Sequence, residues 1–198
     1  MSFHRVVAVA GVAGVLMLPL AAVQAQTSIG NKSVPGVCML SREAVLADST
    51  VGKAADARFK QLVDQADSQL KVQQGALNHD IQQYRAKAKT LTAAEQKSQQ
   101  ESLGLRIHTF QTEKQKLDER ANLTRAEITQ KIGKVVNPLI TSIYKQRGCG
   151  ILLNRNVVLA GNQANDLTTE VVNALNKKMT TISFNLVPLP KQPQQSGK

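Results

Sequence analysis

Apolar residues recur at alternating spacings of three and four between about positions 51 and 147, and no proline interrupts them before Pro138. This is the spacing of the a and d positions of a coiled coil, so the region is predicted to be helical with one narrow apolar seam. Three polar residues, Gln73, Lys114 and Thr124, interrupt the seam. Its other members are Phe59, Val63, Ala66, Leu70, Leu77, Ile81, Tyr84, Ala88, Leu91, Leu103, Ile107, Phe110, Leu117, Ala121, Ile128, Ile132, Val135 and Leu139.

The seam breaks at positions 91–95, where the sequence reads Leu-Thr-Ala-Ala-Glu. Thr92 can accept from the amide of Glu95 while the Glu95 carboxylate accepts from the amide of Thr92, which is the capping box that begins a helix. Two helices with so short a connection bury their seams most readily on each other. We therefore predict a long antiparallel coiled-coil hairpin over 51–147, with Pro138 near its base, where a kink or break is tolerated.

Residues 26–50 and 148–187 flank the hairpin and are predicted to form a small body. A body of this size buries little apolar surface alone, so we expect it to associate with other copies of itself. Short apolar runs predict buried strands at 37–40, 149–153 and 157–160, although the first run could equally begin a helix. A last, edge-type strand is expected at 181–187. A turn of helix is expected at 41–48, and a capped helix at 166–177, begun by Asp166 or Thr168. The predicted fold class is α+β, mainly α.

The first 25 residues have the pattern of a cleaved signal peptide. Arg5 precedes an apolar run, and Val23-Gln24-Ala25 places small residues where a signal peptidase cleaves. An uncleaved membrane anchor is the alternative, because residues 6–25 are just long enough to span a bilayer. At the other end, residues 188–198 are rich in Pro, Gln and Ser, and we predict a disordered tail.

The chain carries a formal net charge of +11. At the predicted tip of the hairpin Arg85, Lys87, Lys89 and Lys97 surround a single acid, Glu95. Most charges on the hairpin are explained by a solvated coiled-coil face. The excess at the tip also favours an anionic partner, either acidic polypeptide or an anionic lipid such as lipopolysaccharide. Nucleic acid is not expected, because no reading motif or aromatic stacking platform is present.

Each half of the hairpin contains one interior glycine, Gly75 and Gly104. Glycine weakens a helix by about 0.5–1 kcal/mol relative to alanine, so both are candidate hinges. When the chain is folded about position 91.5, Gly75 faces His108 and Gly104 faces His79. Rings packed into the gaps opposite the glycines are a structural alternative, and a coincidence of positions is another.

The two cysteines, Cys38 and Cys149, are predicted to form an intrachain disulfide. An exported chain meets an oxidising compartment, and each cysteine lies in a strand candidate next to one base of the hairpin. The alternative is a pair of buried free thiols that act as small apolar residues.

In the order of its segments the chain resembles the Skp/OmpH-like family of periplasmic chaperones. The resemblance covers nearly all of the mature chain. It is carried by the early strand at 37–40, by Val-Leu-Ala-Asp-Ser-Thr-Val-Gly-Lys-Ala-Ala at 45–55, by the Gln- and Lys-rich hairpin, and by Ile-Leu-Leu-Asn-Arg-Asn-Val-Val-Leu at 151–159 followed by Asp-Leu-Thr-Thr-Glu-Val-Val at 166–172. No single one of these motifs is diagnostic. The resemblance implies a homotrimer in which short strands of three subunits build a body and the hairpins project as tentacles around a cavity that holds unfolded outer-membrane proteins.

An enzyme is not expected. Outside the signal the only histidines are His79 and His108, neither has a Cys, Asp or Glu at ligand or triad spacing, and no glycine-rich phosphate loop is present. No cofactor or metal is predicted. The function expected from the resemblance is a periplasmic holdase chaperone. The alternative is a structural coiled-coil adaptor or an anionic-lipid-binding protein of the cell envelope.

Overall fold

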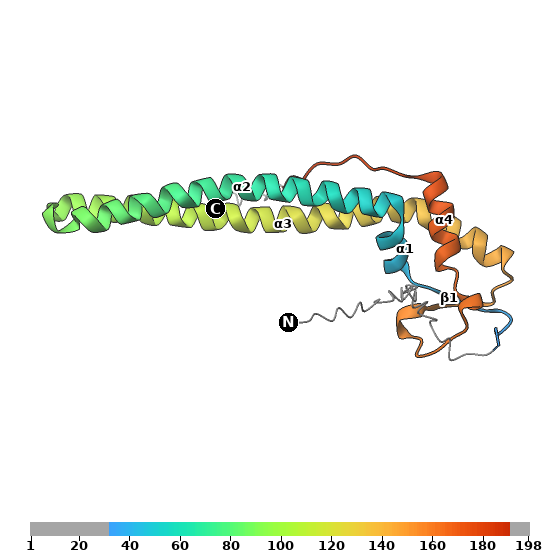
Figure 1. Cartoon of the computed structure of the whole chain (residues 1–198). Helices are drawn as coiled ribbons and strands as arrows, with labels where there is room; N and C mark the ends of the chain where they lie inside the picture. Colours follow the sequence, from blue (N-terminus) through green and yellow to red (C-terminus); the bar gives the residue numbers. More distant parts are fainter. Residues whose placement is uncertain (1–31, 191–198) are drawn as a thin grey trace, which may run out of the picture.

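The computed structural model describes residues 32–190, and two long helices dominate it (Figure 1). Helix α2 spans Thr50–Lys87, a short 3₁₀ turn η1 spans Ala88–Thr90, and helix α3 spans Ala93–Gln146. We call α2, η1 and α3 the arm. The predicted signal peptide and residues 191–198 of the predicted tail lie outside the described residues; residues 188–190 have no regular secondary structure.

The body contains the remaining elements, packed at one end of the arm (Figure 1). They are strand β1 (Val37–Leu40), helix α1 (Arg42–Asp48), strand β2 (Ile151–Asn154), the 3₁₀ turns η2 (Arg155–Val157) and η3 (Gln163–Asn165), and helix α4 (Thr168–Lys178). β1 and β2 form a two-stranded parallel sheet in which Val37 pairs with Ile151 and Leu40 with Asn154. The whole arm is therefore the crossover between two adjacent parallel strands.

Serine caps set the two helix starts at the body end of the arm. The Ser41 hydroxyl accepts from the amide of Ala44 at the start of α1, and the Ser49 hydroxyl accepts from the amide of Gly52 at the start of α2. Ser49 is fully buried, and its hydroxyl satisfies a partly buried amide at the start of α2. Ser49 is also the residue after the end of α1, so a single residue connects α1 to α2.

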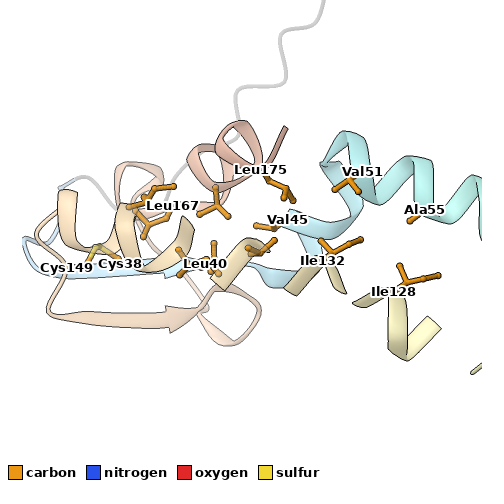
Figure 2. Close-up of a cluster of buried hydrophobic side chains, with 14 of the residues drawn as sticks. Cys38, Leu40, Val45, Val51, Ala55, Ile128, Ile132, Cys149, Leu167 and Leu175 are labelled. Carbon is orange, nitrogen blue, oxygen red and sulfur yellow. A yellow bond between two sulfur atoms is a disulfide. The ribbon is translucent and has the colours of Figure 1, made fainter. Parts of the chain in front are cut away.

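The body core lies where α1 and α4 pack against the base of the arm (Figure 2). Val45, Val51, Leu167, Val171 and Leu175 are fully or almost fully buried. From α3 the core receives Ile132, Val136, Ile140 and Ile143. α3 continues through Pro138 without a break, which places that proline in a helix interior.

The seam of α3 changes face at its base. The sequence pattern predicts Val135 and Leu139 as seam positions, but the structure buries their neighbours Val136 and Ile140 more deeply. The reason is a change of partner: along the arm α3 faces α2, and at the base it also packs against α4. The predicted seam is thus correct up to Ile132 and wrong in detail beyond it.

Two of the predicted strands are not formed. In the run 157–160, Val157 ends the 3₁₀ turn η2 and residues 158–160 have no regular secondary structure. The turn begins where the Asn154 side chain accepts from the amide of Asn156, and Leu159 is fully exposed. Residues 181–187 have no regular secondary structure and run back along the arm, as the segment after α4 in Figure 1 shows. We call residues 181–187 the strap. The strap binds to helices of the arm instead of pairing with the sheet.

Candidate functional site

The arm is firmly packed near the body and thinly packed beyond it. Phe59, Ile128 and Ile132 are buried near the base, whereas farther out Leu77 is buried and the other apolar seam positions are only half-buried. Two apolar side chains lie outside the seam and are mostly exposed, Val72 at 74% and Leu105 at 68%. The distal part of the arm therefore offers scattered apolar surface to solvent.

In this thinly packed part, polar side chains of α2 and α3 contact each other across the helix pair. The Gln100 amide donates to the Tyr84 hydroxyl at 2.7 Å, and Arg106 forms an ion pair with Asp80. Nearer the base the Arg125 guanidinium lies 4.5 Å from the ring centroid of Phe59. Exposed ion pairs contribute little free energy, so these contacts align the helices more than they stabilise them.

At the tip the capping box closes the turn between the helices. The Thr92 hydroxyl accepts from the Glu95 amide at 3.4 Å, and the Glu95 carboxylate accepts from the Thr92 amide at 2.8 Å. The Thr92 hydroxyl also donates to the Glu95 carboxylate at 2.8 Å. The bond from the Thr92 amide, and after it the bond from the Thr92 hydroxyl, lower the pKa of Glu95 below its usual value. Gln96 donates to the carbonyl oxygens of Ala88 and Leu91, which satisfies the end of the preceding turn.

The four basic residues predicted at the tip, Arg85, Lys87, Lys89 and Lys97, all have exposed side chains. Lys97 lies 4.0 Å from Glu101 in a solvent-exposed pair. The tip is therefore a positively charged end on a long projection.

The candidate hinges Gly75 and Gly104 are open on their outer side. A Cβ atom added at either glycine would meet no heavy atom within 4 Å, apart from its own chain neighbours and nearby helix backbone. The suggested packing of a histidine ring against each glycine is therefore wrong. His79 contacts Gln83 on its own helix instead, with 2.9 Å between the ring Nε2 and the amide nitrogen. Bending at these glycines stays a prediction.

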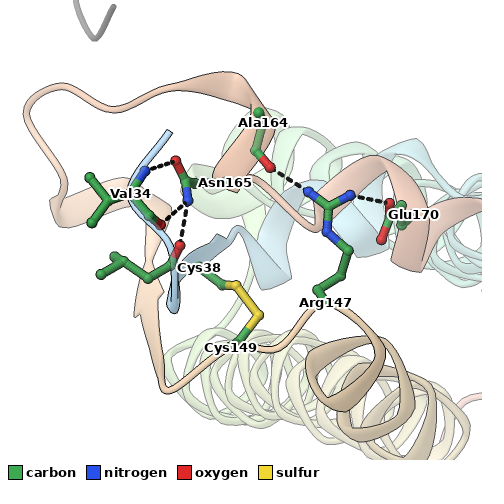
Figure 3. The surroundings of a disulfide bond; sticks show 8 residues. Val34, Cys38, Arg147, Cys149, Ala164, Asn165 and Glu170 are labelled. Carbon is green, nitrogen blue, oxygen red and sulfur yellow. Dashed lines mark hydrogen bonds and ion pairs between the residues drawn. A yellow bond between two sulfur atoms is a disulfide. The ribbon is translucent and has the colours of Figure 1, made fainter. Parts of the chain in front are cut away.

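The structure joins Cys38 and Cys149 in a disulfide, with 5.8 Å between their Cα atoms (Figure 3). α3 ends at Gln146, and Gly148 follows it with a φ of +64°, which suits a residue without a Cβ atom. Around the bond, Asn165 accepts from the Val34 amide and donates to the carbonyl oxygens of Val34 and Val37, and Arg147 pairs with Glu170. The disulfide therefore attaches β1 to the segment just after α3, Asn165 attaches it to η3, and the ion pair of Arg147 attaches α4 to the end of α3.

A groove of about 630 Å³ lies between α1, α2 and α3 at the base of the arm. Leu46, Phe59, Ile128 and Ile132 supply apolar walls, and Arg125 lies at its side. Within residues 32–190 no three His, Cys, Asp or Glu side chains are grouped so that they could hold a metal ion. Among the helices of the same residues, none has the length and apolar character needed to cross a membrane.

A family model described as outer membrane protein (OmpH-like) matches residues 36–175 of this chain. The chain belongs to the OmpH-like family. Among solved structures, an OmpH-like protein from Caulobacter crescentus described as a candidate outer membrane chaperone is 28% identical to it. That match has a TM-score of 0.73 and covers 81% of this chain and 95% of the other. No curated protein sequence matches this OmpH-like chain.

Sequence reasoning missed one part of the site, the position of the strap on the arm. The signal was present as an alternation of apolar and polar residues over Ile182, Ser183, Phe184, Asn185 and Leu186. In the structure the three apolar members are half-buried and the two polar members are exposed. The predicted edge strand is therefore not formed, because the segment packs on α2 and α3 instead of pairing with the sheet.

Proposed function

We propose that this OmpH-like protein is a periplasmic holdase chaperone that binds unfolded outer-membrane proteins and prevents their aggregation before membrane insertion. The observation that supports this best is the arm: two long helices packed on each other, with scattered, partly exposed apolar side chains and a basic surface. Hydrophobic burial is non-directional, so such a surface can hold many different unfolded sequences weakly. The net positive charge keeps the loaded particle soluble and attracts acidic segments.

The arm needs partners to enclose a client, and the body has a surface suited to them. Ile151, Leu153, Val157 and Leu159 are all exposed on β2 and the turn after it, Val157 at 76% and Leu159 at 103%. β2 pairs only with β1 within residues 32–190, so its other edge offers free backbone groups. A homotrimer formed through this face would bury the apolar side chains and place three arms around one cavity.

Suppression of aggregation tests the proposal directly. An unfolded β-barrel outer-membrane protein is diluted from urea into buffer with and without the purified protein, and turbidity is followed. Full suppression at a ratio of three chains to one client is expected. Light scattering on the same sample should report a trimer, and a change of Leu159 to Asp should shift it toward monomer and weaken suppression.

A structural adaptor of the envelope is the competing function, and it predicts no suppression in this assay. It also predicts that the yield of outer-membrane proteins in cells is independent of this protein. An anionic-lipid-binding role is supported by the exposed basic tip and is tested by flotation with vesicles that contain lipopolysaccharide. Binding to these vesicles, together with client aggregation that the protein does not suppress, would favour the lipid-binding role over the chaperone.

A further inference from the structure

The strap is held on the arm through its main chain. The Arg120 guanidinium donates from Nε to the carbonyl oxygen of Val187 at 3.1 Å and from Nη2 to that of Leu186 at 3.3 Å. The amide of Val187 donates to the Thr124 hydroxyl at 2.8 Å. Two residues of α3, one helical turn apart, therefore bind three consecutive main-chain groups of an extended segment.

The orientation of the Thr124 hydroxyl is fixed. It donates its hydrogen to the carbonyl oxygen of Arg120 at 2.6 Å, so only its lone pairs face the strap. The Arg120 guanidinium has no acceptor atoms, so it can only donate, here to two carbonyl oxygens. Thr124 is 1% exposed, and its place in the seam keeps it at this position. The pair presents two donors and one acceptor, a set that matches any extended polypeptide whatever its side chains.

Side chains of the strap add contacts that do not depend on a precise fit. Ile182 and Phe184 pack against the core cluster at the base of the arm. Asn185 lies in sequence between these two side chains and the main-chain contacts at Leu186 and Val187. Its side-chain oxygen accepts from the Arg58 guanidinium on α2 at 3.5 Å. The strap is thus bound as a short extended peptide, with alternate apolar side chains on the helices and its backbone held by Arg120 and Thr124.

We propose that Arg120 and Thr124 form a binding site for the main chain of an extended polypeptide, and that the strap occupies this site until an unfolded client displaces it. This inference rests on the proposed holding function and adds a location to it. Main-chain recognition explains how a surface without specific pockets can hold clients of different sequence. An intramolecular occupant lowers the apparent client affinity in proportion to the fraction of time for which it covers the site.

Hydrogen exchange on the full-length, unaltered protein provides the first test. The Val187 amide is expected to be protected in the free protein, because it donates to Thr124, and to lose protection when the protein is saturated with an urea-unfolded β-barrel outer-membrane protein. Aggregation suppression is measured in the same mixture. Suppression with unchanged protection at Val187 would overturn this inference and leave the proposed function standing. Failure to suppress aggregation would overturn both.

Variants on the strap provide the second test without altering the arm. The double change Ile182→Ser and Phe184→Ser should release the strap and tighten client binding by about tenfold if the strap covers the site nine-tenths of the time. Ser183→Ala is the matched control, because that side chain faces solvent, and it should leave affinity unchanged. Circular dichroism checks that each variant keeps its helices. Equal affinities for the released protein and the control would refute displacement.

A third set of variants locates the site on α3. In the released background, Thr124→Val removes the acceptor with little change of volume, whereas Thr124→Ser keeps the hydroxyl. The valine variant should lose most of the tenfold gain and the serine variant should retain it. Arg120→Met keeps an unbranched side chain and removes the donors, so it should behave as the valine variant does. A gain that survives both Thr124→Val and Arg120→Met would show that clients bind elsewhere.

Discussion

Removing the disulfide by Cys38→Ala and Cys149→Ala should destabilise the body and leave the arm helical. The two cysteines are 111 positions apart in sequence, and the loop they close contains the entire arm. In the chain-entropy model a loop of that length stabilises the folded state by about 5 kcal/mol at 25 °C, because the crosslink restricts the unfolded chain. Engineered and native bonds often deliver less, so this value is an upper bound.

The structure also indicates where the loss should be felt. Without the bond, β1 is attached through its four-residue pairing with β2, the contacts of Asn165 and the core side chains around Leu40. For a chain of this size a loss of 1 kcal/mol lowers Tm by about 2–4 °C, so the full entropic value corresponds to at most about 10–20 °C. The contacts between α2 and α3 do not involve either cysteine.

Thermal unfolding followed by circular dichroism at fixed protein concentration measures the effect. The double variant should unfold at a lower temperature than the oxidised protein, with the same helical signal at 20 °C. Reductant should lower the Tm of the unaltered protein and have no effect on the double variant, which is the control. Two reactive thiols per denatured chain, in protein isolated from the periplasm without reductant, would show that the disulfide does not form. An unchanged Tm in the double variant would show that the disulfide does not stabilise the fold.

Three further predictions concern the arm. Changing Arg85, Lys87, Lys89 and Lys97 to Glu should weaken binding to anionic vesicles in a flotation assay, by about 1 kcal/mol for each basic residue near the surface and less at high salt. The holding of unfolded clients should be affected less. Equal loss of both activities would contradict this prediction. The lowered pKa of Glu95 means that its contribution to the cap is present above the unfolded-state pKa and is lost as the pH falls through the lower folded-state pKa. The protection factor of the Thr92 amide, its exchange rate relative to the intrinsic rate at the same pH, should therefore fall in acid, and Glu95→Gln should abolish that pH dependence. Gly52→Ala should lower the free energy of unfolding in urea by at least about 3 kcal/mol, because the added Cβ would lie 1.6 Å from the carbonyl oxygen of Leu46. The matched changes Gly75→Ala and Gly104→Ala should raise it by about 0.5–1 kcal/mol. An unchanged free energy in Gly52→Ala would show that α1 can move away.

The parts of this fold that follow from local rules could be predicted from the sequence. The seam period places Phe59, Leu77 and Ile128 on buried faces, and the box at Thr92 and Glu95 begins α3 where the motif indicates. Both depend on residues within one or two helical turns of one another. The serine cap at the start of α2 belongs to the same class.

The parts that depend on distant partners could not. Nothing local to Val136 and Ile140 shows that α4, some thirty residues later, covers them in place of the predicted face. The period of two at Ile182, Phe184 and Leu186 reports an extended segment buried on one side, and a helix pair satisfies that pattern as well as a sheet does. The apolar run at 157–160 is exposed in the single chain, so its pattern cannot be explained by contacts within that chain.

The strap also divides the arm into two mechanical parts. The hydrogen bonds at its C-terminal end are to Arg120 and Thr124. Phe59 on α2 lies at the same height along the arm, as its contact with the neighbouring Arg125 shows. Beyond this level α2 and α3 have few fully buried side chains and contain both open glycines. A helix pair opens most easily where it buries least and where its backbone is least restricted. We therefore expect the braced base to hold its direction while the distal part bends. Because displacement of the strap removes the brace, client binding and arm flexibility should increase together.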